Sequence, residues 1–220
     1  MSSADSSETV LILVPEIRDY ERVNLEIVGR LQAGFRRILL QGVEGQRLLV
    51  SGIAGDWEAT VIVEGRAGPD LGAGLNAPKL KVVCQGDVAD GVGHSLRAGF
   101  IQVVGDAGTC AGYGQRGGVI LLEGNVGPRA GLNQKGGLLV LLGTTALLAG
   151  ERRTGGTLAA FGDRLGRLAN YAATGGRSLA LDREELRDDG LDSDVFATLT
   201  DKIEAGRPSS FPTSLDVMTA

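Results

Sequence analysis

Glycine recurs through the middle of this chain at a nearly constant spacing. Six phased glycines stand 21 and then repeatedly 19 residues apart, at Gly65, Gly86, Gly105, Gly124, Gly143 and Gly162. Each of the first five is followed seven residues later by another glycine, at Gly72, Gly93, Gly112, Gly131 and Gly150. Such a period indicates a solenoid, in which one short structural unit stacks on the next.

The length of the period decides which solenoid this is. About 19 residues are too few for two helices and a turn, and apolar runs such as Phe100–Val104 and Leu138–Leu142 have the length of strands. Stacked coils of short strands pair in parallel about 4.8 Å apart. Glycine then recurs at equivalent corners, because it accepts φ > 0 and lets backbones approach closely. The sequence therefore predicts an all-β parallel solenoid.

The same repeat predicts the interior and the domain organisation. We expect small and branched side chains to fill the solenoid, with these candidates: Val82, Ile101, Val103, Ile120, Leu122, Leu139 and Leu141. The chain then divides into a disordered N-terminus (1–8), a strand and helix lead-in that caps the stack (9–50), the glycine-repeat β-helix (51–181), and a C-terminal helix and tail (182–220).

The lead-in carries signals for a strand and a helix. We expect a strand over residues 9–14 and a helix from Asp19 to Gln32, with Asp19 as its N-cap and Glu21 in the first turn. The apolar face of this helix would hold Ile27, Val28 and Leu31. Phe35–Val43 and Arg47–Val50 are predicted to be irregular first strands. This lead-in would cover strand edges at the open end of the stack.

The repeat decays after Gly162. Residues Ala169–Leu181 are predicted to form one more degenerate coil, and Ser193–Ala205 a short helix. The apolar side chains of that helix are Val195, Phe196, Leu199 and Ile203. The tail GRPSSFPTSLDVMTA is either disordered or laid along a partner, with Phe211 as the residue that would anchor it.

Two patterns in the sequence suggest a ligand site, but the residues around them do not fit such a site. GYGQRGG, from Gly112 to Gly118, fits the dinucleotide pattern G-x-G-x-x-G, which needs a helix after the glycines. A short apolar run, Val119–Leu122, follows instead, so we interpret the motif as a solenoid corner.

A calcium ladder would need an aspartate after each phased glycine. Asp87, Asp106 and Asp163 satisfy this, but Arg66, Asn125 and Thr144 do not, which favours turn-forming residues.

The charge, the hydropathy and the cysteines of the chain argue against nucleic-acid binding, a membrane segment and a metal site. The net charge is −5 with no long basic run, which argues against nucleic-acid binding. The apolar run Val10–Val14 is too short for a signal or membrane segment, so we expect a soluble, cytoplasmic protein without a membrane partner. Cys84 and Cys110 form no C-x-x-C pair, and we expect ordinary buried thiols rather than metal ligands. A disulfide between them stays open, although a cytoplasmic setting argues against it.

Candidate chemistry is sparse. His94 is the only histidine, and the other repeats carry Ala73, Tyr113, Leu132 and Glu151 at its position, so we interpret it as a solvent-facing or interface residue. Arg152 and Arg153, with Arg164 and Arg167 beyond them, form either a solvated basic edge or an anion-binding or docking patch. Cys110 is either a reactive thiol or, next to Ala111, a packed one. We predict no catalytic, cofactor-binding or metal-binding residue in this chain.

The repeat also resembles a known domain. The ladder GRAGPDLG, GDVADGVG, GDAGTCAGYGQRGG, GNVGPRAGLNQKGG and GERRTGG resembles the glycine-repeat (GXGXG) β-helix domain of the glutamate synthase large subunit, over about residues 22–163. RVNLEIVGRLQAGFRRILLQGVEGQR, from Arg22, resembles the entry of versions encoded as separate chains. The β-helix is also similar to one structural subunit of formylmethanofuran dehydrogenase and to one subunit of N-methylglutamate synthase.

The resemblance implies a right-handed parallel β-helix with short helical appendages that serves as a noncatalytic scaffold. Its implied partners are a glutamine amidotransferase subunit and an FMN-dependent synthase subunit, which would hold the FMN and the iron–sulfur cluster. A hetero-oligomer is therefore expected, and a homo-oligomer stays open. Two alternatives remain: the structural subunit of a formylmethanofuran dehydrogenase or formyltransferase/hydrolase-type one-carbon complex, and a freestanding ligand-binding β-solenoid.

Overall fold

The computed structural model describes residues 9–14, 19–160, 170–180, 197 and 201. The chain divides into two compact units, 1–181 and 182–220, and nearly all described residues belong to the first. The predicted disordered N-terminus, Gly162 and the tail with Phe211 lie outside the described residues. So does the predicted helix Ser193–Ala205, apart from residues 197 and 201.

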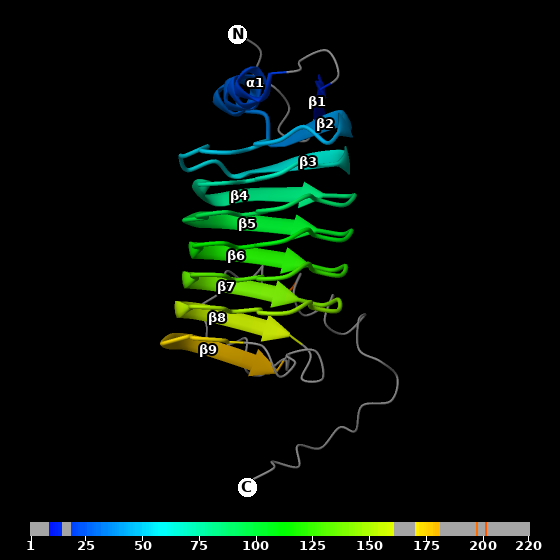
Figure 1. The fold of residues 1–220 in the computed structure, drawn as a ribbon. Helices are drawn as coiled ribbons and strands as arrows, with labels where there is room; N and C mark the ends of the chain where they lie inside the picture. Colours follow the sequence, from blue (N-terminus) through cyan, green and yellow to red (C-terminus); the bar gives the residue numbers. More distant parts are fainter. Residues whose placement is uncertain (1–8, 15–18, 161–169, 181–196, 198–200, 202–220) are drawn as a thin grey trace, which may run out of the picture. The chain divides into compact units, whose positions relative to one another are not determined.

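Nine parallel strands form one sheet in chain order, each stacked on the strand of the preceding coil (Figure 1). The strands are β1 (Thr9–Leu13), β2 (Arg37–Glu44), β3 (Ala59–Arg66), β4 (Asn76–Cys84), β5 (Ala98–Val103), β6 (Arg116–Leu122), β7 (Lys135–Leu141), β8 (Thr154–Ala160) and β9 (Gly175–Ala180). Residues at the same phase of the repeat pair directly, as Ile101 does with Ile120 and Ile120 with Leu139. The predicted parallel β-helix is confirmed.

A second and thinner ladder joins the coils outside the sheet. It consists of a ladder of isolated bridges, one residue per coil, through Ala67, Val88, Ala107, Val126 and Thr145. Each coil of the repeat thus has one full strand and one single-residue bridge, joined by tight turns.

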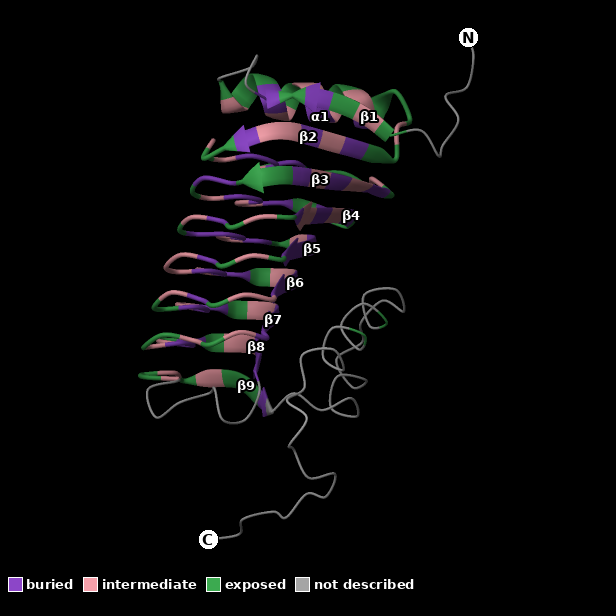
Figure 2. Ribbon diagram, turned by 90° about the vertical axis from the view of Figure 1, so that its right-hand side faces the viewer, coloured by how far each residue is buried: buried purple, intermediate pink, exposed green. Residues whose placement is uncertain are grey.

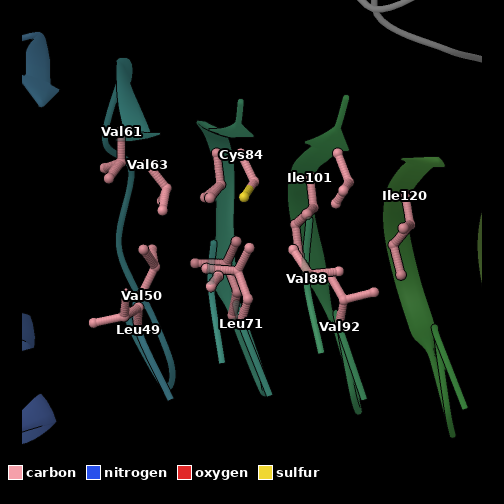
Figure 3. Packing of buried hydrophobic residues seen from close by; sticks show 14 of the residues in the cluster. Leu49, Val50, Val61, Val63, Leu71, Cys84, Val88, Val92, Ile101 and Ile120 are labelled. Carbon is pink, nitrogen blue, oxygen red and sulfur yellow. The ribbon is translucent and has the colours of Figure 1, made fainter. Parts of the chain in front are cut away.

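The interior is a continuous apolar column inside the stack. All seven predicted interior residues are completely buried and belong to one cluster. In Figure 3, Val61, Val63 and Ile101 on the strands face Leu71 and Val88 on the opposite side of the coils. Buried positions recur at the same place in successive coils (Figure 2), as expected when equivalent residues stack.

The two series of glycines have different physical causes. In the phased series, Gly143 has no positive φ, but a Cβ there would collide with the carbonyl oxygen of Gly124 in the coil before it. In the second series, Gly112 has φ 67°, in the left-handed region. Val50 and Asn170 adopt the same conformation at this position in the first and last coils, with φ 58° and 65°. The turn therefore requires the conformation, and glycine adopts it with least strain.

Helix α1 (Tyr20–Gln32) closes the N-terminal end of the stack (Figure 1). As predicted, Asp19 is its N-cap and accepts a hydrogen bond from the Glu21 amide (3.0 Å). Ile27 and Leu31 are buried as expected, together with Val23, whereas Val28 is only partly buried. The helix rests on the first coil through Asn24. Its side chain donates to the Leu48 carbonyl (2.8 Å) and accepts from the Val50 amide (2.7 Å).

One predicted strand is wrong. Residues Arg47–Val50 form a turn, in which Leu48 and Val50 have φ of 57° and 58°. Their apolar side chains suggested a strand, but two left-handed residues cannot extend, and Leu49 and Val50 are buried from a turn instead. The strand expected at Phe35–Val43 is present as β2, and the degenerate coil expected after Ala169 is present over residues 170–180.

The collision at Gly143 predicts that Gly143 and Gly114 differ in how well they tolerate a substitution. Gly143→Ala should lower the free energy of unfolding by about 1–3 kcal/mol, because the methyl group must push apart two stacked backbones. Gly114→Asn should change it little. Asn133 already occupies the equivalent left-handed position in the next coil, and the nearest atom, Ser95 Oγ, would lie 3.6 Å from the new Cβ. Urea unfolding of both variants measures this, and equal destabilisation would contradict the explanation.

Candidate functional site

A polar depression lies on the turn that leads into each of the strands β6, β7 and β8. In each of these turns the middle of three consecutive residues points inward: Gln115, Gln134 and Arg153 are at most 2% exposed. The residues on either side are partly or fully exposed: Gly114 and Arg116, Asn133 and Lys135, Arg152 and Thr154. The outward neighbours thus form two rows that run along the stack, with backbone between them.

A cavity of about 360 Å³ lies between these rows and spans four coils. Its lining consists of His94, Ser95, Tyr113, Gly114, Arg116, Asn133, Lys135, Arg152 and Thr154. This set contains three permanent cations, a histidine, hydroxyls and an amide, and it contains no carboxylate. Such a lining offers hydrogen-bond donors and positive charge, which suit an anion.

Buried glutamine side chains support the depression from inside. Gln115 Nε2 donates to the carbonyls of Gly118 and Leu138, both at 3.1 Å. Gln134 Nε2 donates to Gln115 Oε1 (3.1 Å) and to the Thr157 carbonyl (3.2 Å). These bonds connect successive coils through their interior and hold the outward residues at fixed spacing. A buried polar group needs such partners, because an unpaired one costs about 1–3 kcal/mol.

Arg153 corrects the prediction of a basic edge. Arg152 is exposed as expected, but Arg153 is 2% exposed and points into the stack. Its guanidinium donates to Asn170 Oδ1 and Ser178 Oγ, both at 2.8 Å, and to the Arg177 carbonyl. Arg164 and Arg167 lie outside the described residues.

The acceptors of Arg153 are all neutral. Burial lowers the pKa of Arg153 from its ordinary value, because the charged form loses hydration. Among the described residues no carboxylate pairs with this guanidinium, and its Nε has no hydrogen-bond partner there. The guanidinium therefore lies among neutral acceptors of the last described coil.

Two carboxylates beside lining residues are each engaged with a basic side chain. His94 Nδ1 lies 3.4 Å from Asp70 Oδ1, and the His94 ring packs against Tyr113 with centroids 4.9 Å apart. Glu151 Oε2 lies 3.0 Å from Arg129 Nε. Within the described part of the chain, Arg116, Lys135 and Arg152 make no ion pair. The predicted role of His94 as a surface residue fits this placement, since it forms one wall of the depression.

The sequence indicated Arg152 as a surface cation, but Arg116 and Lys135, which also line the depression, were not predicted. Arg116 and Lys135 stand at the same offset, four residues after Gly112 and Gly131, so the repeat itself held the signal. Aligning the outward positions of the coils would have placed both side chains in one row. Only the three-dimensional turn shows that Arg152, two residues after Gly150, lies across from that row.

The aspartates after the phased glycines link successive coils. The Asp106 amide donates to Asp87 Oδ1 (2.9 Å), and the Asn125 amide donates to Asp106 Oδ1 (2.6 Å). Asn125 Oδ1 in turn accepts from the Thr144 amide (3.1 Å). These bonds join successive coils, so the side chains form a ladder along the stack, and Asp163 lies outside the described part. Among the described residues no group of three or more His, Cys, Asp or Glu side chains could hold a metal ion.

The two cysteines differ from each other. Both are free thiols, so no disulfide joins them. Cys84 is completely buried, as predicted, and burial raises the pKa of its thiol above the ordinary value. The prediction of a buried thiol is wrong for Cys110, which is only half-buried and has φ 58°, in a turn beside buried Ala111.

This difference predicts selective alkylation. Iodoacetamide at about pH 8 should modify Cys110 in the folded protein and leave Cys84 intact, because burial blocks access to Cys84 and disfavours its thiolate. Peptide mass spectrometry after timed quenching measures both rates. In urea the two rates should converge, and equal rates in the folded state would contradict the burial of Cys84.

The outward face of the sheet is a second surface. One column of outward side chains runs through every strand in register: Leu11, Leu39, Ile62, Val83, Gln102, Leu121, Val140, Ala159 and Leu179. From Gln102 onward these side chains are at most 9% exposed. On β1 to β4 they are partly open, and Leu11 is 45% exposed.

Comparisons with protein-family models, with curated proteins and with solved structures return no match. The likeness to the glutamate synthase β-helix domain thus remains a prediction based on its motifs. No helix in the described part of the chain is both long and apolar enough to cross a membrane. The geometry of the two surfaces is therefore the basis for a functional proposal.

Proposed function

We propose that this chain is a noncatalytic structural subunit of a glutamate synthase-like complex. In this role it bridges a glutamine amidotransferase subunit and an FMN-dependent synthase subunit, and those partners hold the FMN and the iron–sulfur cluster. The type of complex rests on the motif resemblance over residues 22–163. The structural role rests on the geometry of the stack.

The observation that carries the structural role is the apolar outward face of the sheet. Parallel sheets are normally covered on both faces, and their strands are then apolar at successive positions. The strands here follow that pattern, as in the run Val119–Leu122. On β5 to β8 the outward side chains are buried, whereas Leu39, Ile62 and Val83 on β2 to β4 stay partly open. A partner chain docked on this upper part would complete the covered face.

The stack is also suited to hold partners at a fixed separation. Each coil pairs with the next through backbone hydrogen bonds and shares one apolar interior. Protein interiors are densely packed and deform little, so surfaces on different coils keep their spacing. A bridging subunit needs this property, because the two enzyme parts it joins must stay in one arrangement.

Purification of the tagged chain from its native cells tests the proposal. Mass spectrometry should identify a glutamine amidotransferase chain and a flavoprotein chain in the eluate, and its absorption spectrum should be that of a flavin. A metallohydrolase-like chain with a formyltransferase would instead favour the one-carbon alternative. A lone colourless chain would contradict the scaffold role and favour the freestanding solenoid.

A single charge on the open part of the face should weaken this association. Ile62→Lys should reduce recovery of the partner chains at least tenfold, because an ammonium group buried in an apolar contact loses its hydration. Leu147→Lys is the matched control: Leu147 is 61% exposed and lies outside the sheet, so recovery should not change. Urea unfolding checks that both variants fold. Full recovery with Ile62→Lys would show that partners dock elsewhere.

A further inference from the structure

We propose that the polar depression binds a phosphate group, either free or esterified to a small organic molecule. The depression is the cavity lined by Arg116, Lys135 and Arg152 with their neighbours. This inference concerns the isolated chain and does not depend on the proposed scaffold role, so either of the two can fail while the other holds.

The depression gathers positive charge that has no acidic partner. The whole protein has a formal net charge of −5, yet the lining holds three permanent cations and no carboxylate. The side chains of Arg116, Lys135 and Arg152 make no ion pair or hydrogen bond with any residue in the described part of the chain. Like charges repel one another, so this place favours a ligand with negative charge.

Uncharged donors complete the lining. The hydroxyl groups of Ser95 and Thr154 and the side-chain amide of Asn133 belong to the same cavity. These side chains also have no hydrogen-bond partner among residues 9–14, 19–160 and 170–180. Because the lining residues stand on both rows of outward turn positions, a ligand between the rows meets donors from two sides.

The backbone of these turns has its donors already engaged. The amides at Gly114, Asn133 and Arg152 donate to carbonyls of the next coil, at Leu132 (2.8 Å), Glu151 (2.9 Å) and Tyr171 (2.8 Å). A glycine-rich loop at a helix N-terminus holds phosphate with free backbone amides, and this turn cannot do so. Side chains must therefore supply the contacts, and their charge decides the affinity.

This set of side chains fits a phosphate group better than a single carboxylate. A phosphate monoester carries about 1.5 to 2 negative charges at pH 7 and has three strong acceptor oxygens. A carboxylate carries one charge and has two oxygens. A guanidinium binds phosphate oxygens in pairs, and an ammonium binds them as a point charge. One compact dianion can thus engage all three cations, and it requires no fixed distance between two separate acidic groups.

The cavity has room for more than free phosphate. Its floor is open at Gly114, where a Cβ would have Ser95 Oγ as its nearest atom, at 3.6 Å. A water molecule takes about 30 Å³ in the liquid, so the five heavy atoms of phosphate take roughly 150 Å³ at most. The cavity measures about 360 Å³, which leaves space for a small group esterified to the phosphate.

An NMR titration of the full-length chain, at constant ionic strength, tests this with inorganic phosphate and phenyl phosphate as probes. Acetate is the carboxylate control. We expect saturable amide shifts around the depression, with a Kd of about 1 mM or lower for a phosphate probe. Its affinity should be at least tenfold higher than that of acetate. Equal affinity for acetate, or no saturable shift with either phosphate probe, overturns the proposal.

The two phosphate probes distinguish the sources of the group. Tighter binding of phenyl phosphate than of inorganic phosphate would identify an organic phosphate as the ligand, because the attached group then adds contacts in the remaining space. Equal or weaker binding of phenyl phosphate would identify free phosphate. Either result supports a phosphate site.

Substitutions at Gly114 separate charge from shape. Gly114→Asp places a carboxylate among the cations and should weaken phosphate binding at least tenfold, because it repels the ligand and pairs with its cations. Gly114→Asn adds a side chain of the same shape without the charge and should weaken binding far less. Both fit the left-handed backbone, which Asp70 and Asn133 adopt with φ of 63° and 53°. Equal weakening by the two variants would contradict recognition by charge.

Gly52→Asp is the control for net charge. Gly52 occupies the same turn position three coils before Gly114, since its amide also donates to the next coil, at Ala73 (2.8 Å), and its φ is 66°. At about 4.8 Å per coil the two positions lie about 14 Å apart, beyond the screening length of about 8 Å at 0.15 M salt. Its phosphate affinity should stay unchanged. Equal weakening by Gly52→Asp and Gly114→Asp would overturn the site, and thermal unfolding verifies that each variant is folded.

Discussion

Direct stacking of each residue on its equivalent in the next coil is the constraint on which the structure depends. Because paired strands keep a fixed register, a position that faces inward in one coil faces inward in all of them. The same constraint brings corner backbones into contact, and this is why Gly124 and Gly143 cannot carry a side chain. Glycine periodicity, interior composition and register are thus three consequences of one geometry.

One inward position of the repeat, in the turn before each strand, varies in residue type from coil to coil. It is apolar in the early coils and polar in the later ones: Ile53, Leu75, Leu96, Gln115, Gln134 and Arg153. A buried glutamine is tolerated because the glutamine stacked on it supplies an acceptor, as Gln115 does for Gln134. At Arg153 the ladder ends in a charge whose donors reach Asn170 and Ser178 in the last described coil. The guanidinium thereby replaces apolar packing where the glycine pattern has decayed.

The sequence was sufficient for features that repeat and insufficient for those that do not. Phased glycines and apolar runs predicted the stacked strands and the interior residues. The turn at Leu48 was missed because its left-handed backbone is imposed by stacking on later coils, with no glycine to mark it. The inward direction of Arg153 was missed because composition favours arginine at the surface, and only its phase in the repeat places it inside.

The side chains at the outward turn positions are not dictated by stacking. The left-handed position after each second-series glycine accepts Gly114, Ser95, Asn133 and Arg152 alike, so stacking does not dictate its side chain. The exposed position two residues later is equally unconstrained by the interior. The fold therefore gives no reason for Arg116, Lys135 and Arg152 to gather without an acidic partner among the described residues. Gathering like charges costs free energy, so these three side chains mark a place where the surface departs from what stacking alone requires.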